Sequence, residues 1–180
     1  MREHEREHEL ERIIGYKFHN IDLLTIALTH TSYANESKEK VHHNERLEFL
    51  GDSVLSVVTA DYLFHAWKDR PEGDLSRTRA SLVSEGALFQ FAQEIELGSY
   101  LRLGRGEDLN GGRNRPSVVS DAFEAVIAAL YLDGGIDGVK EFFASGRGGE
   151  AYWAEPYFGY YRNTDSWVYR KHAYMLKAAG

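Results

Sequence analysis

The sequence predicts an all-α protein. Apolar residues recur at the three- and four-residue spacing of helix faces along most of the chain. Almost no stretch alternates apolar and polar residues as a half-buried strand does. Hydrophobic residues make up 43% of the 180 residues, which is enough for a packed core, so we do not expect general disorder. The length suits one domain with an appendage.

The long helix of the first half of the chain is its clearest element. In order, the pattern predicts a short helical start at residues 10–14, a helix at 21–28, a polar loop or frayed helix end at 34–43, and a strongly apolar helix from 45 to about 66. Gly15 ends the first segment. Asn20 is the expected N-cap of the second, because its side chain can accept a hydrogen bond from a free backbone N–H.

The most apolar helix comes late in the chain. The sequence predicts a turn at residues 71–74, helices from 74 or 75 to 83 and from 84 to about 94, a connector at 97–103, a glycine-containing loop at 104–116, a helix at 121–132 and a short final helix at 138–144. The residues Asp133-Gly134-Gly135 are expected to stop the apolar helix, because glycine is favoured just past a helix end.

The composition shifts at Ser145, which predicts a domain at residues 1–144 and an appendage of unknown fold at 145–180. The appendage has 36 residues, nine of them aromatic, with five basic and three acidic side chains, whereas the first 144 residues carry 16 basic and 25 acidic ones. Its rings could stack on exposed bases, form a strap over a dimer or have no function, and we assign it no role.

Composition also excludes several kinds of chemistry. The chain has no cysteine, so it has no disulfide, thiolate zinc site or cysteine nucleophile, which fits a reducing cytoplasm. No stretch reaches the roughly 20 apolar residues that cross a bilayer, and the charged N-terminus is no signal peptide, so we expect no membrane partner. The net charge of −7 argues against a surface that coats nucleic acid, although carboxylates that hold Mg²⁺ would also make the charge negative.

Two pairs of acids within apolar helical runs carry the most chemical information. Glu48 and Asp52 are four residues apart, and Asp121 and Glu124 are three apart, so each pair shares a helix face. Carboxylates on apolar helices need a cation, because like charges repel and burial strengthens the repulsion. Two such faces brought together would form an oxygen cage for one or two Mg²⁺ ions, which could activate water and neutralise charge on a phosphate.

Each pair also has an interpretation without a metal. Asp121 and Glu124 resemble a capping box at a helix start, where acids suit the helix dipole. Glu48 and Asp52 could lie on a solvated face, with Arg46 as their ion-pair partner. Either pair alone is a weak signal, whereas both in one small helical domain favour the metal site.

A series of short motifs follows in order along the chain: residues 14–18 (IGYKF), 27–33 (ALTHTSY), 44–55 (NERLEFLGDSVL), 72–76 (EGDLS), 111–113 (GGR), 115–117 (RPS) and 120–125 (SDAFEA). The segment at 44–55, around the first acidic pair, resembles the signature of the ribonuclease III family, the endonucleases of double-stranded RNA. The resemblance runs from about Leu10 to Phe143. So many ordered matches are highly specific, and they imply the all-α fold of the family's endonuclease domain, as a dimer.

The resemblance implies roles for seven residues. The four metal-binding carboxylates of its catalytic centre would be Glu48, Asp52, Asp121 and Glu124. The two acids at the rim of its active-site valley, which help to bind RNA or metal, would be Glu45 and Glu72, and the aromatic that plugs a pocket on the partner subunit would be Phe49.

The resemblance also implies a reaction. A homodimer would cut both strands of duplex RNA with Mg²⁺, for which Mn²⁺ could substitute, leaving 5′-phosphate and 3′-hydroxyl ends in the processing of ribosomal or other structured RNA in the cytoplasm. Gly51, which is costly in a helix, would allow close approach at the dimer seam. Most bacterial members continue into a double-stranded-RNA-binding domain, which residues 145–180 are too few to form, so an accessory RNA-binding protein could supply that surface.

Two other functions stay open. One is a non-catalytic duplex-RNA-binding or ribosome-associated protein of the same fold, although such relatives typically lose the acids. The other is a metal-dependent phosphohydrolase of small nucleotides, although the sequence lacks the paired His-Asp ligands usual in such sites.

Several other polar residues have a structural interpretation. We expect His30 to be a buried structural histidine, and His4 and His8 to lie on a solvated helix face rather than bind a metal. Arg77 and Arg79 could contact phosphates or be surface charges.

Overall fold

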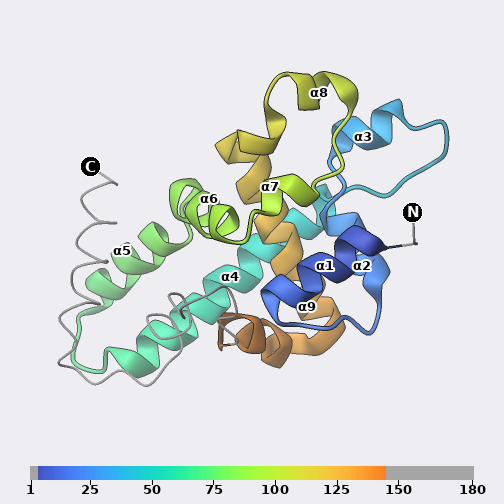
Figure 1. Cartoon of the computed structure of the whole chain (residues 1–180). Helices are drawn as coiled ribbons and strands as arrows, with labels where there is room; N and C mark the ends of the chain where they lie inside the picture. The colour runs from blue at the N-terminus through green and yellow to red at the C-terminus, as the bar shows by residue number, and fades with distance from the viewer. Residues whose placement is uncertain (1–3, 145–180) are drawn as a thin grey trace.

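The computed structural model describes residues 4–144, and its regular elements are helices (Figure 1). In chain order they are α1 (Glu5–Ile14), α2 (Ile21–Ala27), α3 (Thr31–Glu36), α4 (Glu45–Ala66), α5 (Glu72–Leu82), α6 (Glu85–Glu94), α7 (Leu97–Tyr100), α8 (Arg105–Leu109), the 3₁₀ helix η1 (Gly112–Asn114) and α9 (Pro116–Ala144). Within this part of the chain, β pairing is limited to an isolated bridge between Thr29 and Arg102. The all-α prediction is therefore confirmed.

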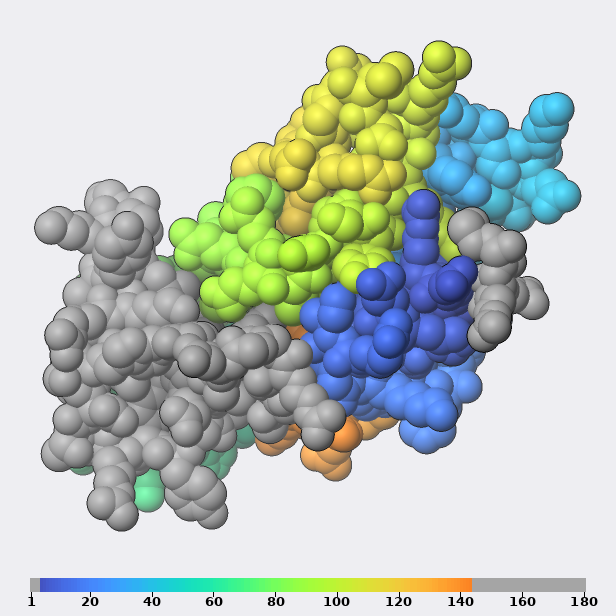
Figure 2. Space-filling model, viewed as in Figure 1, coloured from blue at the N-terminus to red at the C-terminus, as the bar shows by residue number. Residues whose placement is uncertain are grey.

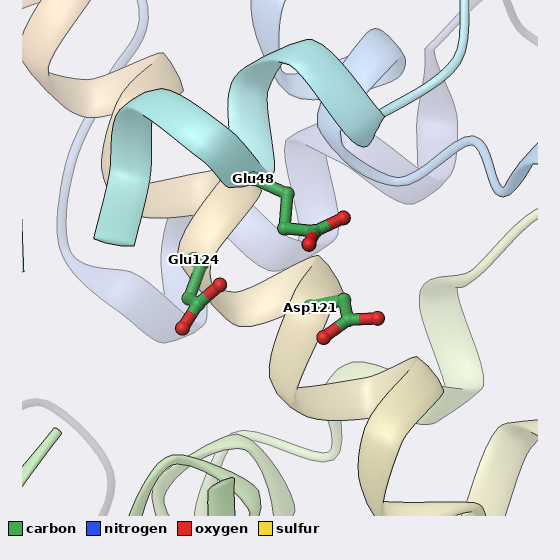
Figure 3. Close-up of side chains that lie close together, drawn as sticks. All are labelled: Glu48, Asp121 and Glu124. Carbon is green, nitrogen blue, oxygen red and sulfur yellow. The ribbon is translucent and has the colours of Figure 1, made fainter. Parts of the chain in front are cut away.

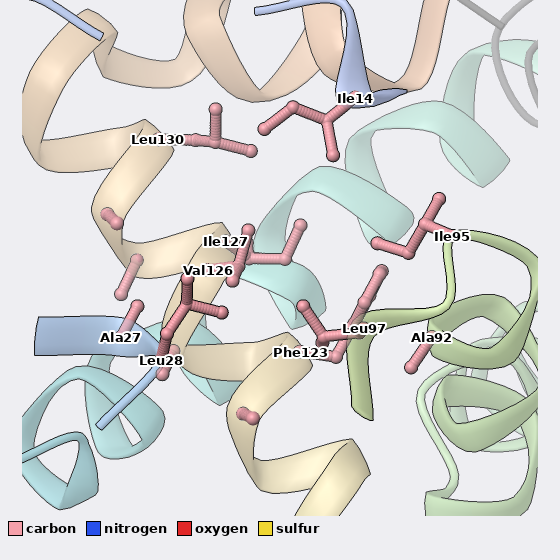
Figure 4. Close-up of a cluster of buried hydrophobic side chains, with 14 of the residues drawn as sticks. Ile14, Ala27, Leu28, Ala92, Ile95, Leu97, Phe123, Val126, Ile127 and Leu130 are labelled. Atoms are coloured by element: carbon pink, nitrogen blue, oxygen red, sulfur yellow. The ribbon is translucent and has the colours of Figure 1, made fainter. Parts of the chain in front are cut away.

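The central helix is α9, against which α2, α4, α6, α7 and η1 pack. Figure 4 shows side chains of α9 facing residues from α1, α2, α6 and α7; the labelled ones are Ile14, Ala27, Leu28, Ala92, Ile95, Leu97, Phe123, Val126, Ile127 and Leu130. Phe123 and Leu130 are completely buried, and each such burial stabilises the fold by about 1.5–3 kcal/mol. A helix covered on nearly every side must be apolar all round, which explains its composition.

Helix caps predicted from the sequence are present at both ends of the first loop. Gly15 follows α1 in the left-handed conformation, with φ of 70°. The Asn20 side chain caps α2 by accepting a hydrogen bond from the backbone N–H of Asp22, at 3.2 Å. The boundaries predicted for α2 and α4 agree with the structure to within one residue.

Several predicted helix bounds and loop segments were wrong, including the start of the last long helix, which lies at Pro116 and not at residue 121. The first helix begins at Glu5, not Leu10, because Glu7 is buried against Arg102 (2.5 Å) and Thr25 (3.1 Å). The short helices α3 and α8 occupy segments expected to be loop or to join elements. Helix α5 begins at Glu72, inside the predicted turn.

The predicted stop at residues 133–135 is a kink. Helix α9 continues to Ala144, with a non-helical residue at Gly135 (φ 66°, ψ −163°). Asp133 accepts hydrogen bonds from the Tyr16 hydroxyl (2.9 Å) and from the backbone N–H groups of His19 (2.9 Å) and Asn20 (2.8 Å). These bonds hold the kink against the segment before α2.

One end of the described molecule is formed by α3 and α8, which lie side by side in the space-filling view (Figure 2, light blue and yellow). The backbone N–H of Arg105 donates to the Glu36 carboxylate at 2.8 Å, which joins the two short helices. None of the helices in residues 4–144 combines the length and apolar character that crossing a bilayer requires. The predicted appendage lies outside the described residues.

Candidate metal centre

Helix α4 supplies the first acidic pair. Glu45, Glu48 and Asp52 lie along its first two turns, and the start of the helix is held by a hydrogen bond from the Asn44 N–H to the Thr29 carbonyl, at 2.9 Å. Glu48 is half-buried, whereas Asp52 is exposed. The helix therefore aims Glu48 inward and leaves Asp52 at the edge.

Helix α9 supplies the second pair from its interior. The helix begins at Pro116, so Asp121 and Glu124 lie one to two turns inside it and cannot act as a capping box. Both side chains are half-buried. The capping interpretation of this pair was therefore wrong, and these two carboxylates do not have the stabilisation that a helix N-terminus gives.

Gly51 brings the two helices together. A Cβ atom at this position would lie 1.9 Å from the backbone oxygen of Glu124, so only glycine lets α4 contact α9 this closely. The predicted close approach therefore occurs, but between two helices of the same chain and not at a dimer seam. It places Glu48, three residues before Gly51, beside the acids of α9.

Three of the four predicted carboxylates converge. Glu48, Asp121 and Glu124 each offer an oxygen, and these atoms all lie within 4.8 Å of one another. Figure 3 shows the three side chains in the angle between α4 and α9. Asp52 is not within this group, but its charge raises the pKa of both Glu48 and Glu124, so it lies within electrostatic reach of them.

The local electrostatics disfavour ionisation of the cluster. Burial raises the pKa of Glu124 to about 8, and the neighbouring charges of Asp52, Asp121 and Glu48 add to the rise. Burial likewise raises the pKa of Glu48, with contributions from Asp121, Glu45 and Asp52. Burial and the charge of Glu85 raise the pKa of Asp121, while His30 acts in the opposite direction.

No ion pair with a basic side chain compensates these charges in the described part of the chain. The ion pairs of residues 4–144 include none of the four acids, and none from Arg46. Arg46 is therefore not the ion-pair partner of Glu48 and Asp52, and of these two acids only Asp52 is exposed. Converging oxygen donors, raised pKa values and the absence of an ion-pair partner in residues 4–144 together fit a hard divalent cation such as Mg²⁺.

Two groups near Asp121 were not predicted as parts of this site. His30 was expected to be structural, and it is the N-cap of α3, accepting a hydrogen bond from the Ser32 N–H at 3.2 Å. It is half-buried rather than buried. Glu85 is an exposed residue in the first turn of α6. Neither residue is near Asp121 in the sequence, so no helical spacing of residues could have predicted that they act on Asp121.

The two predicted rim acids are exposed. Glu45 lies one turn before Glu48, with its carboxylate 3.7 Å from Nδ1 of His43. Glu72 is the first residue of α5 and accepts a hydrogen bond from the Ser76 hydroxyl at 2.5 Å. The charge of Glu45 acts on Glu48. Glu72 is outside the three-carboxylate group.

The remaining candidates behave mostly as surface groups. Phe49 is 79% exposed, although it is a large apolar side chain in the middle of an apolar run. Arg77 forms an ion pair with Asp74 one turn away on α5. His4 lies 3.9 Å from Asp22 and His8 lies 2.8 Å from Glu11, so each histidine has a carboxylate neighbour of its own.

Fold and site together define a class of protein: an all-α domain whose two longest helices hold a half-buried acidic cluster at their contact. The chain belongs to the ribonuclease-III-like family, whose family model matches residues 20–146. All four predicted carboxylates lie within the matched range.

Individual relatives agree with this assignment. Ribonuclease 3 of Clostridium tetani is 56% identical over 134 residues, which are 74% of this chain and 57% of the relative. Ribonuclease 3 of Caldanaerobacter subterraneus is 53% identical over 131 residues, which are 73% of this chain and 58% of the relative. The nuclease domain of ribonuclease III from Campylobacter jejuni has a similar structure, with a TM-score of 0.72, 38% identity, and coverage of 88% of this chain and 100% of that one. The chain thus spans a little under three-fifths of these two curated relatives.

Proposed function

We propose that this chain is an endoribonuclease that hydrolyses phosphodiester bonds of double-stranded RNA with Mg²⁺, acting as a homodimer. The observation that carries the proposal is the convergence of Glu48, Asp121 and Glu124 within 4.8 Å, with Asp52 beside them, in a member of the ribonuclease-III-like family. The names of the relatives, Ribonuclease 3, support the same reaction.

The donor set supports Mg²⁺ as the cofactor, with Mn²⁺ as a substitute. Mg²⁺ takes oxygen ligands and is usually held by one or two carboxylates together with water and substrate phosphate. Glu48, Asp121 and Glu124 would hold it, and Asp52 would join them or bind a water next to it. When bound, the ion supplies an activated water and positive charge at the scissile phosphate.

The protein's own residues contribute orientation and charge. Gly51 fixes the separation of α4 and α9, so the carboxylates stand in place before RNA arrives. None of them forms an ion pair with a basic side chain of residues 4–144, so their charges stay available to a bound cation. Glu45 and Glu72, both exposed, would lie toward the RNA at the rim of the site.

A homodimer is supported by the most exposed aromatic side chain of α4 and by a relative. Phe49 projects from the helix that carries Glu48 and Asp52, where it would fit a pocket on a second copy. The structure from Campylobacter jejuni is described as having structural flexibility in a region involved in dimer formation. Two centres in one dimer would cut the two strands of a duplex and leave 5′-phosphate and 3′-hydroxyl ends.

The natural substrate is proposed by chemical class only. A-form duplex RNA is recognised mainly through shape and 2′-hydroxyls, so a structured precursor such as ribosomal RNA would fit. We propose the cytoplasm as the compartment of the reaction. An accessory RNA-binding protein would add phosphate contacts, and these supply much of the affinity for RNA. We also propose that residues 1–144 are the catalytic domain and 145–180 an appendage to it.

The test is a cleavage assay with duplex RNA, single-stranded RNA and nucleotides, each with Mg²⁺ and with chelator. We expect cutting of the duplex alone, and only with Mg²⁺. Glu124→Gln should lower the rate at least about 100-fold, because it removes a charged ligand at nearly constant shape. Asp69→Asn, which removes an exposed charge elsewhere, is the matched control. Cleavage by Glu124→Gln at the normal rate would contradict the proposal.

A further inference from the structure

Two consecutive residues at the start of α4 carry polar side chains without a hydrogen-bond partner in the described part of the chain. Asn44 is 3% exposed and occupies the N-cap position of α4, yet its side chain forms neither a capping bond nor any other hydrogen bond within residues 4–144. Nδ1 of His43 is buried and has no hydrogen-bond partner there either. Buried polar groups are nearly always bonded, so this pair requires an explanation.

The backbone fixes the place of Asn44 relative to the acidic cluster. Its φ of −82° and ψ of −12° are helical, and its carbonyl accepts the Glu48 N–H at 2.8 Å, so the two residues lie one helical turn apart on the same face. At this spacing Cβ atoms are about 5–6 Å apart, and helix side chains lean toward the N-terminus, so Glu48 is directed over the turn that begins at Asn44. Asn44 therefore borders the three-carboxylate group to which Glu48 belongs (Figure 3).

The amide of Asn44 is held at the edge of the site but is not used by the fold. The Asn44 backbone N–H donates to the Thr29 carbonyl at 2.9 Å, so the residue stays in place without any bond from its side chain. The amide atoms are not among the fully buried atoms that lack a partner, so the small exposed area of Asn44 includes the amide. A ligand at the acidic cluster can therefore reach it.

An amide supplies what the neighbouring acids do not. Glu45, Glu48 and Asp52 on the same helix only accept hydrogen bonds when ionised, whereas the Asn44 amide both donates and accepts. A ribose 2′-hydroxyl also donates and accepts, and it is the group that distinguishes RNA from DNA. We infer that Asn44 contacts a ribose 2′-hydroxyl next to the scissile phosphate and so selects RNA at this site. The inference rests on the proposed function, because it assumes that duplex RNA binds at the acidic cluster.

The test is a double-mutant cycle between the Asn44 side chain and the 2′-hydroxyl. The substrates are a hairpin RNA with one mapped cleavage site and versions of it with a single 2′-deoxy nucleotide at each position flanking that site. At one position the 2′-deoxy substitution should lower kcat/KM of the full wild-type chain about 3- to 10-fold, which is the typical effect of one hydrogen bond. Asn44→Ala should lose a similar factor on the all-ribose hairpin, and the same 2′-deoxy substitution should then cost it nothing more.

Two further variants separate this contact from helix capping and from general surface effects. Serine is also a favoured N-cap residue, so Asn44→Ser keeps a capping side chain that is too short to replace the amide. It should lose sensitivity to the 2′-deoxy substitution as Asn44→Ala does, with a thermal unfolding midpoint near that of the wild type. Asn35→Ala removes an exposed asparagine of α3 and should keep the full 2′-deoxy penalty.

The contrary results are distinct from one another. If every 2′-deoxy substitution slows Asn44→Ala and Asn44→Ser as much as it slows the wild type, the proposed contact is overturned. A wild-type chain that no single 2′-deoxy substitution slows overturns it as well, and that result does not depend on the folding of any variant. A wild-type chain that does not cut the all-ribose hairpin with Mg²⁺ would instead overturn the proposed function, and this inference with it.

Discussion

At the scale of single residues, Glu124 has the most unusual environment in the described chain. Its pKa is raised to about 8, first by burial and then by the charges of Asp52, Asp121 and Glu48. At neutral pH the metal-free carboxyl is therefore mostly protonated, although a metal ligand must be ionised. Metal binding should release a proton, and affinity for Mg²⁺ should rise with pH.

The stability of the metal-free protein should fall as pH rises. The pKa of Glu124 is about 8 in the folded chain, against an ordinary value of 4.5. The folded state therefore holds a proton that the unfolded state has lost, so stabilisation present below about pH 4.5 disappears as pH rises toward 8. Thermal unfolding in chelator between pH 5 and 9 should show a falling midpoint.

The same experiment has an internal control. Glu124→Gln cannot ionise, so its midpoint in chelator should fall less with pH and exceed that of the wild type at pH 9. Added Mg²⁺ should raise the wild-type midpoint most at high pH, because binding to the folded state alone stabilises it. If the unfolding midpoints of wild type and Glu124→Gln fall in parallel with pH, the Glu124 carboxyl does not cause the loss of stability.

At the scale of elements, the contact between α4 and α9 depends on Gly51. Gly51→Ala would place a methyl group 1.9 Å from the Glu124 backbone oxygen, which neither helix can avoid without moving. We expect a loss of about 1–3 kcal/mol or more in the free energy of unfolding, together with weaker Mn²⁺ binding, because the carboxylates move apart.

A second glycine provides the comparison for Gly51. A Cβ at Gly86, in the first turn of α6, would meet nothing within 4 Å. Gly86→Ala should therefore leave stability unchanged or raise it by up to about 1 kcal/mol, with Mn²⁺ affinity unaltered. Denaturant unfolding of both variants checks this pair. If Gly51→Ala is as stable as Gly86→Ala, the close helix contact is not rigid.

The elements predicted well are those with strong local signals. The spacing of apolar residues within α4 predicts its length. Asn20 marks the start of α2 because its side chain can cap a helix, and Gly15 marks the end of α1 because glycine adopts the left-handed conformation. The spacing of the acids on α4 and α9 likewise requires only the helical repeat. These features could be read from the sequence because they depend on neighbours three or four residues away.

The elements that were missed depend on contacts with distant parts of the chain. Glu7 becomes part of a helix because Arg102, 95 residues later, pairs with it. Helix α3 is capped by His30 and joined to α8 through Glu36, so neither short helix is predictable from its own residues. The partner of Gly51 was wrongly assigned for the same reason, since the contact with Glu124 exists only in the folded chain.

At the scale of the whole molecule, α4 keeps an apolar stripe exposed on one face. Phe49, Val57 and Phe64 are spaced eight and seven residues apart, so they lie along the same side of the helix, and they are 79%, 60% and 69% exposed. Isolated exposed apolar residues are common, but an aligned set on the helix that carries the site indicates an interface. The proposed homodimer would bury this stripe next to the acids.

The last prediction concerns Phe49 and the assembly. Because an aromatic anchor in a partner pocket is typically worth about 2 kcal/mol or more, Phe49→Ala should raise the dimer dissociation constant roughly 30-fold or more in sedimentation equilibrium. Leu109→Ala, at a 77% exposed residue on α8, is the matched control and should dimerise as the wild type does. Duplex cleavage by Phe49→Ala should fall at low protein concentration and recover at high concentration, because the site itself is intact. A dimer that Phe49→Ala leaves unweakened would move the interface elsewhere, whereas cleavage that does not recover with concentration would place Phe49 in the RNA-binding surface.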